Sequence, residues 1–77
     1  MKDLVEYIVK ALVDNPEQVV VSEIKGTKTS VLELSVAKGD LGKVIGKHGR
    51  NINAIRIIIT AASATARKGR TVLEIIE

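Results

Sequence analysis

Cysteine is absent from this 77-residue chain, and Tyr7 is its one aromatic residue. Without cysteine, neither a disulfide framework nor a thiolate metal site is available to the fold. No apolar run approaches the roughly 20 residues that a helix needs to cross a bilayer. The first residues combine acidic and apolar side chains, unlike the basic start of a signal peptide. We therefore expect a cytoplasmic protein.

Aliphatic side chains make up nearly all of the hydrophobic fraction of 45%, which is enough for a compact core. A chain of this length is expected to form one domain, residues 1–77, near the lower size limit for a self-sufficient core. Tyr7 is expected to pack half-buried against that core. A single aromatic side chain cannot supply a platform on which bases stack.

The net charge of +3 is unevenly distributed along the chain. Residues 1–37 carry four lysines against six acidic residues (net −2), and residues 71–77 carry two glutamates (net −2). Residues 38–70 carry eight basic residues against Asp40 alone (net +7). An ordinary solvated helix face is one explanation, but the near-absence of acidic residues over this segment favours a polyanionic partner.

The first half of the chain has the pattern of one helix followed by two strands. Apolar residues at four-residue spacing predict a helix over residues 3–14, which ends before Pro16 because a residue preceding proline avoids the helical region. Strands are predicted over residues 19–25 and 30–37, and the short turn at 26–28 makes them an antiparallel hairpin. The apolar stripe of the helix consists of Leu4, Ile8 and Leu12, with Val5 and Val9 beside it.

The second half predicts a short helix over residues 41–45, a long helix over residues 51–67 and a strand over residues 70–76. Asp40 is expected to cap the short helix, and the long helix is expected to keep most polar residues, Ser63 among them, off its apolar stripe. That stripe consists of Ile52, Ile55, Ile59, Ala62 and Ala66. The order α-β-β-α-α-β predicts an α+β fold, with three helices packed on a three-stranded mixed sheet whose last strand runs parallel to the second.

A Gly-x-x-Gly segment, Gly46 to Gly49, lies between the two later helices and contains Lys47 and His48. Glycine adopts backbone angles that other residues avoid and lets another backbone approach closely. The segment also leads into a helix N-terminus, where unpaired amides and the positive end of the dipole favour an anion. With Arg50 adding charge, the pattern indicates a contact point for a phosphate backbone. A tight helix-turn-helix corner is the alternative explanation.

Aliphatic residues flank the glycine segment on both sides. Val44, Ile45 and Ile52 can form an apolar strip beside the positive loop, and a single-stranded nucleic acid matches that pair of surfaces. Its phosphates would meet the loop while its bases lie against the strip. The same three residues are equally suited to the core.

Residues 44–52, VIGKHGRNI, resemble the V-I-G-x-x-G-x-x-I signature of KH domains, and the element order resembles the type II form found in bacteria. The resemblance covers essentially the whole chain. More narrowly, residues 40–49, DLGKVIGKHG, in a domain of this size resemble the KhpA family of small bacterial RNA-binding proteins. Neither the two glycines nor the flanking aliphatic residues depart from that pattern.

The resemblance implies a loop that clamps about four nucleotides of single-stranded RNA, in an RNA chaperone-like protein. It further implies a homodimer or a heterodimer with a KhpB-type partner, and an influence on cell shape and cell wall biogenesis. The implied RNA-binding residues are Lys43, Val44, Ile45, Gly46, Lys47, His48, Gly49, Arg50 and Ile52.

Two other function classes compete with RNA binding. Catalysis is disfavoured, because His48 has no cysteine partner and only Asp40 as a nearby acid, and because residues 42–48 are one residue short of a P-loop and lack its Ser or Thr. We therefore expect no enzyme, no cofactor and no metal. A protein-interaction module with secondary RNA or single-stranded DNA contact is the second class. It is suggested by apolar residues that widen the stripe of the long helix, namely Ile57, Ile58 and Ala61.

Overall fold

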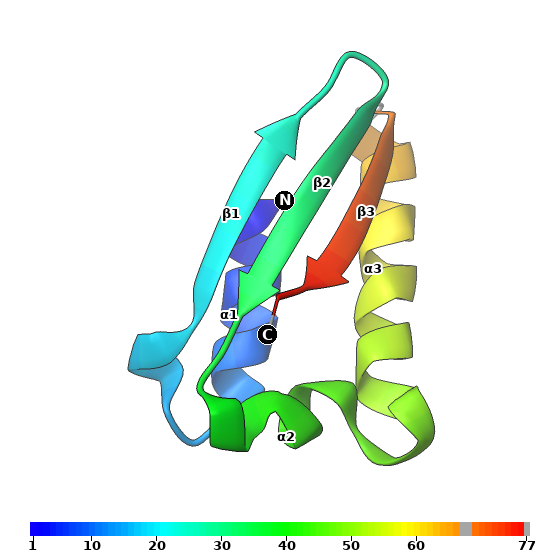
Figure 1. The fold of residues 1–77 in the computed structure, drawn as a ribbon. Helices are drawn as coiled ribbons and strands as arrows, with labels where there is room; N and C mark the ends of the chain where they lie inside the picture. Colours follow the sequence, from blue (N-terminus) through cyan, green and yellow to red (C-terminus); the bar gives the residue numbers. More distant parts are fainter. Residues whose placement is uncertain (67–68, 77) are drawn as a thin grey trace.

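The computed structural model describes residues 1–66 and 69–76. Its elements follow the predicted order α-β-β-α-α-β, with short 3-10 turns between some of them (Figure 1). The helices are α1 (Lys2–Leu12), α2 (Leu41–Ile45) and α3 (Arg50–Ala66), and the strands are β1 (Val20–Lys25), β2 (Thr29–Ser35) and β3 (Arg70–Ile75). Arg67, the predicted last residue of the long helix, lies outside the described residues.

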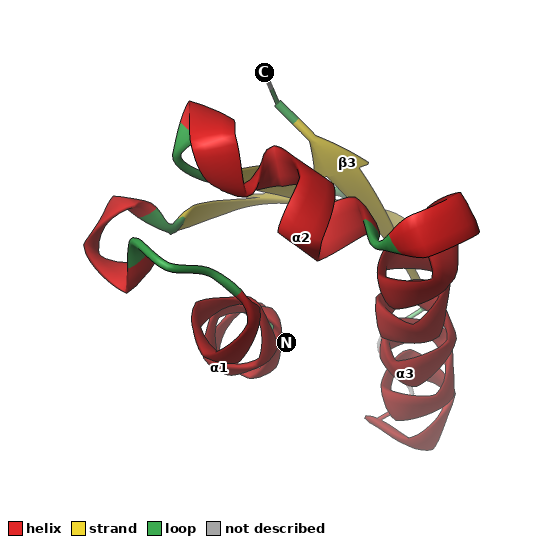
Figure 2. Ribbon diagram, turned by 90° about the horizontal axis from the view of Figure 1, so that it is seen from below, coloured by secondary structure: helices red, strands yellow, loops and turns green. Residues whose placement is uncertain are grey.

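The three strands form one mixed sheet in the order β1-β2-β3. β1 and β2 form the antiparallel hairpin, and β3 pairs parallel to β2 after the crossover through α2 and α3. All three helices lie on one side of this sheet, with α1 and α3 next to each other beneath it (Figure 2). The predicted α+β architecture is therefore confirmed, and no described helix covers the other face of the sheet.

The core lies between the sheet and the helices. Leu32 and Leu34 of β2 are fully buried, and Leu73 of β3 lies beside Leu32 in the parallel register. From α3, Ile55 and Ile59 pack into the same cluster, because residues three to four positions apart lie on one face of a helix. The predicted stripe of α3 is thus confirmed where it faces the sheet.

The inner face of α1 differs from the prediction by one residue position. Val5 and Val9 are 0% exposed, whereas Leu4 is 36% exposed. Tyr7 is 77% exposed, so its predicted half-buried position was wrong. Both apolar rows repeat at four-residue spacing. The rotation of the helix buries Val5 and Val9 completely, whereas Ile8 and Leu12 of the predicted stripe are partly buried and pack against the same core.

Ser63 was expected to lie off the apolar stripe of α3, but it is 3% exposed. It follows Ile59 by four residues and so continues the buried row. Its hydroxyl oxygen has no hydrogen-bond partner among the described residues. The predicted position of this side chain was wrong, because the face of α3 that packs on the sheet continues one helical turn beyond the last isoleucine of the buried row.

Asp40 occupies the N-cap position of α2, but its carboxylate makes no capping hydrogen bond. The side chain is 2% exposed, and one of its oxygens accepts hydrogen bonds from the backbone N–H of Asn15 at 2.9 Å and from Asn15 Nδ2 at 3.1 Å. Burial raises the pKa of Asp40, but these hydrogen bonds outweigh it and hold the pKa below its ordinary value. The carboxylate therefore fastens the segment after α1 to the base of α2, instead of capping the helix.

Candidate nucleic-acid interface

The glycine segment forms a tight connection between α2 and α3. Gly46 ends α2 with φ of 77° and ψ of 169°, and its amide donates to the carbonyl of Gly42 at 2.8 Å. A Cβ added at Gly46 would lie 2.9 Å from the backbone nitrogen of Asn51 and 2.7 Å from its Cγ. The Asn51 side chain is itself held in place, because its Nδ2 donates to the carbonyl of Lys43 at 2.8 Å. Glycine is therefore required here by both conformation and space.

The next residues keep the chain in unusual conformations. His48 has φ of 58° and ψ of 25°, and Gly49 has φ of 75°. His48 is the one residue other than glycine with positive φ in the described part of the chain. Residues held in sparsely populated backbone regions concentrate at functional sites. The turn is closed by a hydrogen bond from the Gly49 amide to the Gly46 carbonyl at 3.1 Å.

This backbone presents positive charge to solvent. Lys47, His48 and Arg50 are all exposed, and α3 begins directly at Arg50. The first amides of a helix lack internal partners, and the dipole is positive at that end. The amides of Gly49 and Arg50 already donate to the carbonyls of Gly46 and Lys47. What the loop offers to phosphate oxygens is therefore side-chain charge together with the positive end of the helix dipole.

Lys43 lies one turn before the loop but is already engaged. Its ammonium group forms an ion pair with Asp14 and lies 3.9 Å from a carboxylate oxygen of Asp40. The hydrogen bond to Asp14 raises the pKa of Lys43 above its ordinary value. Of the basic residues expected at the site, Lys43 is therefore the one that forms an ion pair with another described residue.

The three aliphatic residues beside the loop differ in exposure. Val44 is fully buried and Ile52 is almost fully buried, whereas Ile45 is partly buried. Val44 and Ile52 belong to the main hydrophobic cluster, which also contains Val9 and Leu34. They can anchor the loop from below, and Ile45 has surface left for a ligand.

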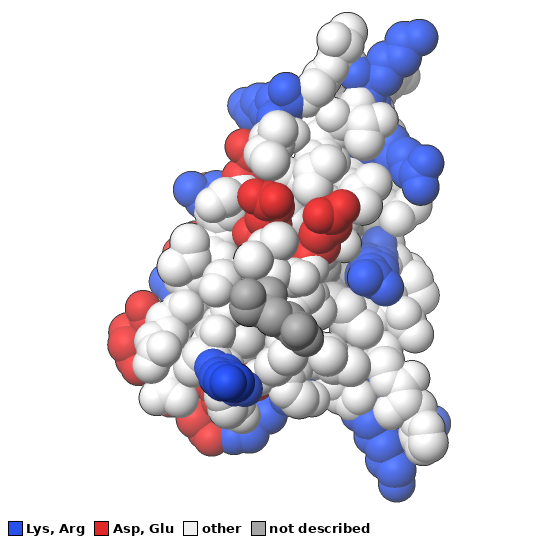
Figure 3. Space-filling model, viewed as in Figure 1, with Lys and Arg blue, Asp and Glu red and all other residues white. Residues whose placement is uncertain are grey.

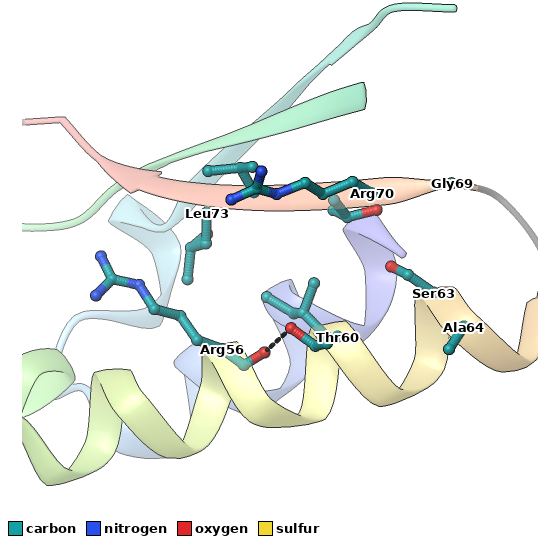
Figure 4. A pocket seen from close by; sticks show the side chains of 10 residues that line it. Arg56, Thr60, Ser63, Ala64, Gly69, Arg70 and Leu73 are labelled. Carbon is teal, nitrogen blue, oxygen red and sulfur yellow. Dashed lines mark hydrogen bonds between the residues drawn. The ribbon is translucent and has the colours of Figure 1, made fainter. Parts of the chain in front are cut away.

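A groove of about 720 Å³ runs between α3 and β3, and sequence reasoning did not identify it. Figure 4 shows Arg56 extending from α3 and Arg70 lying along β3, with the Ser63 side chain directed toward the strand. The floor and walls include Ile59, Leu73 and Val72. The groove thus combines an apolar interior with two guanidinium groups at its walls.

The side of the molecule formed by α3 and the open sheet face carry opposite charge. Glu33 and Glu74 are direct neighbours in the parallel pairing of β2 and β3. They alternate with the buried Leu32 and Leu73, so they face away from the helices. Figure 3 shows acidic side chains in the middle of the sheet face and basic side chains along the border formed by α3. A polyanion is therefore favoured along α3 and disfavoured on the open sheet.

The residues expected at a protein interface form a separate surface on α3. Ile57 is 69% exposed, and Ile58 and Ala61 are also exposed. Across residues 1–66 and 69–76, no helix is long and apolar enough to span a membrane. Nor does the described part of the chain bring together three or more histidine, cysteine or acidic side chains that could hold a metal ion.

Comparison with known proteins places this geometry in a family context. Residues 2–75 match the family described as "KhpA/KhpB, KH domain". Three similar proteins carry the name "RNA-binding protein KhpA". That of Clostridium acetobutylicum is 54% identical over 76 residues, covering 99% of this chain and 100% of the relative. That of Aquifex aeolicus is 53% identical over 77 residues, covering 100% and 96%. That of Chlamydia trachomatis serovar D is 51% identical over 77 residues, covering 100% and 97%. No solved structure matches the chain.

Proposed function

Because the chain belongs to the KhpA/KhpB KH-domain family, a family without enzymatic activity, we propose that it binds single-stranded RNA through the loop from Gly46 to Gly49. RNA binding as such is supported by the names of relatives that match over their full length. The role of the loop is supported by one observation above all. Positive φ angles at three of four consecutive residues turn exposed Lys47 and His48 outward at the start of α3.

The physical account divides the RNA into two parts. The phosphates of about four nucleotides lie against the loop backbone, where Lys47 and Arg50 supply positive charge. The bases extend from the loop into the groove between α3 and β3, where apolar side chains receive their faces. Arg56 and Arg70 stand at the groove walls and can stack on bases or pair with phosphates. Because no aromatic side chain contributes, we expect micromolar affinity for one domain.

The proposal is tested by reversing the charge of the loop. Lys47→Asp combined with His48→Asp should remove binding of a short unstructured RNA in fluorescence anisotropy, because both side chains are exposed and the fold does not depend on them. A matched control, Lys2→Asp with Gln18→Asp, makes the same change in net charge at exposed positions remote from the loop. Binding should persist in the control and weaken as salt rises.

Unchanged affinity in a folded loop variant would refute the clamp. Equal loss in the loop variant and the control would show that only net charge matters. A parallel titration with single-stranded DNA of the same sequence tests whether the sugar contributes, since phosphate contacts alone do not distinguish the two nucleic acids.

We further propose that the apolar surface of α3 formed by Ile57, Ile58 and Ala61 is a protein interface, either in a homodimer or with a KhpB-type partner. Exposed isoleucines on a domain this small favour assembly, which adds buried area to a limited core. Sedimentation of the wild type and of Ile57→Asp tests it. Only monomer at high micromolar concentration, both alone and with a KhpB-type protein, would contradict this second proposal.

The resemblance to KhpA proteins also suggests a cytoplasmic RNA chaperone that influences cell shape and cell wall biogenesis. A deletion strain complemented with the wild type or with the loop variant tests this. We expect the cell-shape defect to be corrected by the wild type alone.

A further inference from the structure

We propose that the end of the molecule opposite the glycine loop carries a second phosphate-contact site, formed by Lys25 and Lys28 of the β1–β2 hairpin together with Arg70 of β3. This inference rests on the proposed function. It extends the RNA path from the loop along the whole of α3, beyond the nucleotides that the loop itself holds.

Backbone contacts hold the hairpin and the start of β3 together, although these segments are far apart in the sequence. The Arg70 amide donates to the carbonyl of Lys28 at 3.1 Å, and Thr29 pairs with Arg70 in the parallel register. Gly69 has φ of 75°, and a Cβ added there would lie 2.6 Å from the Lys28 carbonyl oxygen. The start of β3 therefore packs directly against the hairpin. This contact fixes the spacing between the backbone of Lys28 and that of Arg70.

The charges at this site are available to a ligand. Lys25, Lys28 and Arg70 are exposed, and none of them takes part in the salt bridges among the described residues. Lys10 and Lys43, in contrast, are both ion-paired within the protein. The hairpin end therefore has positive charge that the fold itself does not use.

The site is continuous with the groove. Gly69 and Arg70 line the groove at the hairpin end, and Arg56 lines it nearer the glycine loop. Figure 3 shows separate basic side chains along the border of the molecule at α3, between the two ends. On the open face, Glu33 and Glu74 oppose an alternative path across the sheet.

The length of α3 sets the number of nucleotides required. Its 17 residues extend about 25 Å at a rise of about 1.5 Å per residue. A stacked strand with a phosphate every 3.4 Å or so needs about eight phosphates to cover that distance. A tetranucleotide held at the loop would not reach the hairpin when stacked, whereas a dodecanucleotide would.

The test compares oligonucleotide lengths. Fluorescence anisotropy measures the affinity of a tetranucleotide and a dodecanucleotide, both unstructured RNA, for the wild type, for Lys25→Glu/Lys28→Glu, and for the control Lys2→Glu/Lys10→Glu on α1. Counterion release makes each phosphate contact worth about fivefold at 0.1 M salt. We expect the hairpin variant to lose about tenfold or more for the dodecanucleotide and less than about twofold for the tetranucleotide, and the control to lose little for either.

Two results would overturn the inference while leaving the glycine loop in place. One is an unchanged affinity of the hairpin variant for the dodecanucleotide; the other is an equal loss for both lengths. If the wild type binds neither oligonucleotide, the proposed function itself is wrong, and the second site with it.

Discussion

Replacing Gly46 by alanine tests whether the loop is built as described. Its φ of 77° and ψ of 169° lie in a backbone region that essentially only glycine occupies. Another residue held there is destabilised by about 1–3 kcal/mol. The added Cβ would also lie 2.9 Å from the backbone nitrogen of Asn51, and the backbone cannot rotate away as a flexible side chain can. We therefore expect a loss of about 3 kcal/mol or more in the free energy of unfolding.

Such a loss is large for this chain. A domain of this size has a free energy of unfolding of about 4–12 kcal/mol, and each kcal/mol changes the melting temperature by about 4–8 °C. Urea and thermal denaturation should therefore show Gly46→Ala melting about 12 °C or more below the wild type. Gly49→Ala should lose only about 1–2 kcal/mol, because its φ of 75° is strained but its Cβ would meet no atom closer than 3.6 Å.

Gly42→Ala is the matched control. It lies within α2, and a Cβ there would meet nothing within 4 Å. Alanine is the better helix former, so we expect a gain of about 0.5–1 kcal/mol. If Gly46→Ala proves as stable as Gly42→Ala, the described conformation of the loop is wrong.

Three further predictions concern single side chains. The folded-state pKa of Asp40 lies below its ordinary value of 3.8, so the charged carboxylate stabilises the fold at neutral pH, and this contribution is lost as the pH falls below 3.8 through the folded-state pKa. Asp40→Asn should therefore flatten the acidic part of the curve of stability against pH. An unchanged curve would contradict the assignment. Lys43→Ala should weaken RNA binding less than Lys47→Ala in anisotropy titrations, because Asp14 already balances the charge of Lys43; an equal loss would show that RNA displaces the ion pair. Ser63→Ala should leave urea stability unchanged or raise it by up to about 1 kcal/mol, because its buried hydroxyl lacks a partner, and a clear loss would reveal a partner for it.

The order of the elements and the position of the loop could be predicted because their signals are local. The alternation along β2 identifies a strand, and the three-to-four spacing of Ile52, Ile55 and Ile59 identifies a helix. Each pattern can be recognised within a single element. The parallel pairing of β3 with β2 then follows from the helical crossover that connects the two strands. The need for glycine at position 46 follows from a motif of a few residues.

What could not be predicted depends on how elements meet. Asp40 has the local pattern of a helix cap, but its partner is Asn15, 25 residues earlier in the chain. Arg56 and Arg70 become walls of one groove only because β3 lies beside α3 at the edge of the sheet. Tyr7 carries no periodic signal that distinguishes packing from exposure. In each case the deciding contact is long-range, and the residue types alone permit both outcomes.

The central claim is that the glycine loop clamps an RNA backbone, and an NMR titration of the labelled protein with an unstructured tetranucleotide tests it most directly. The account predicts that the largest shift changes occur at the backbone amides of residues 46–50, followed by Arg56, which lines the groove nearer the loop. The amides of Glu33 and Glu74, on the open sheet face, should change least. Saturable changes centred on the open sheet, with the loop amides unaffected, would contradict the account.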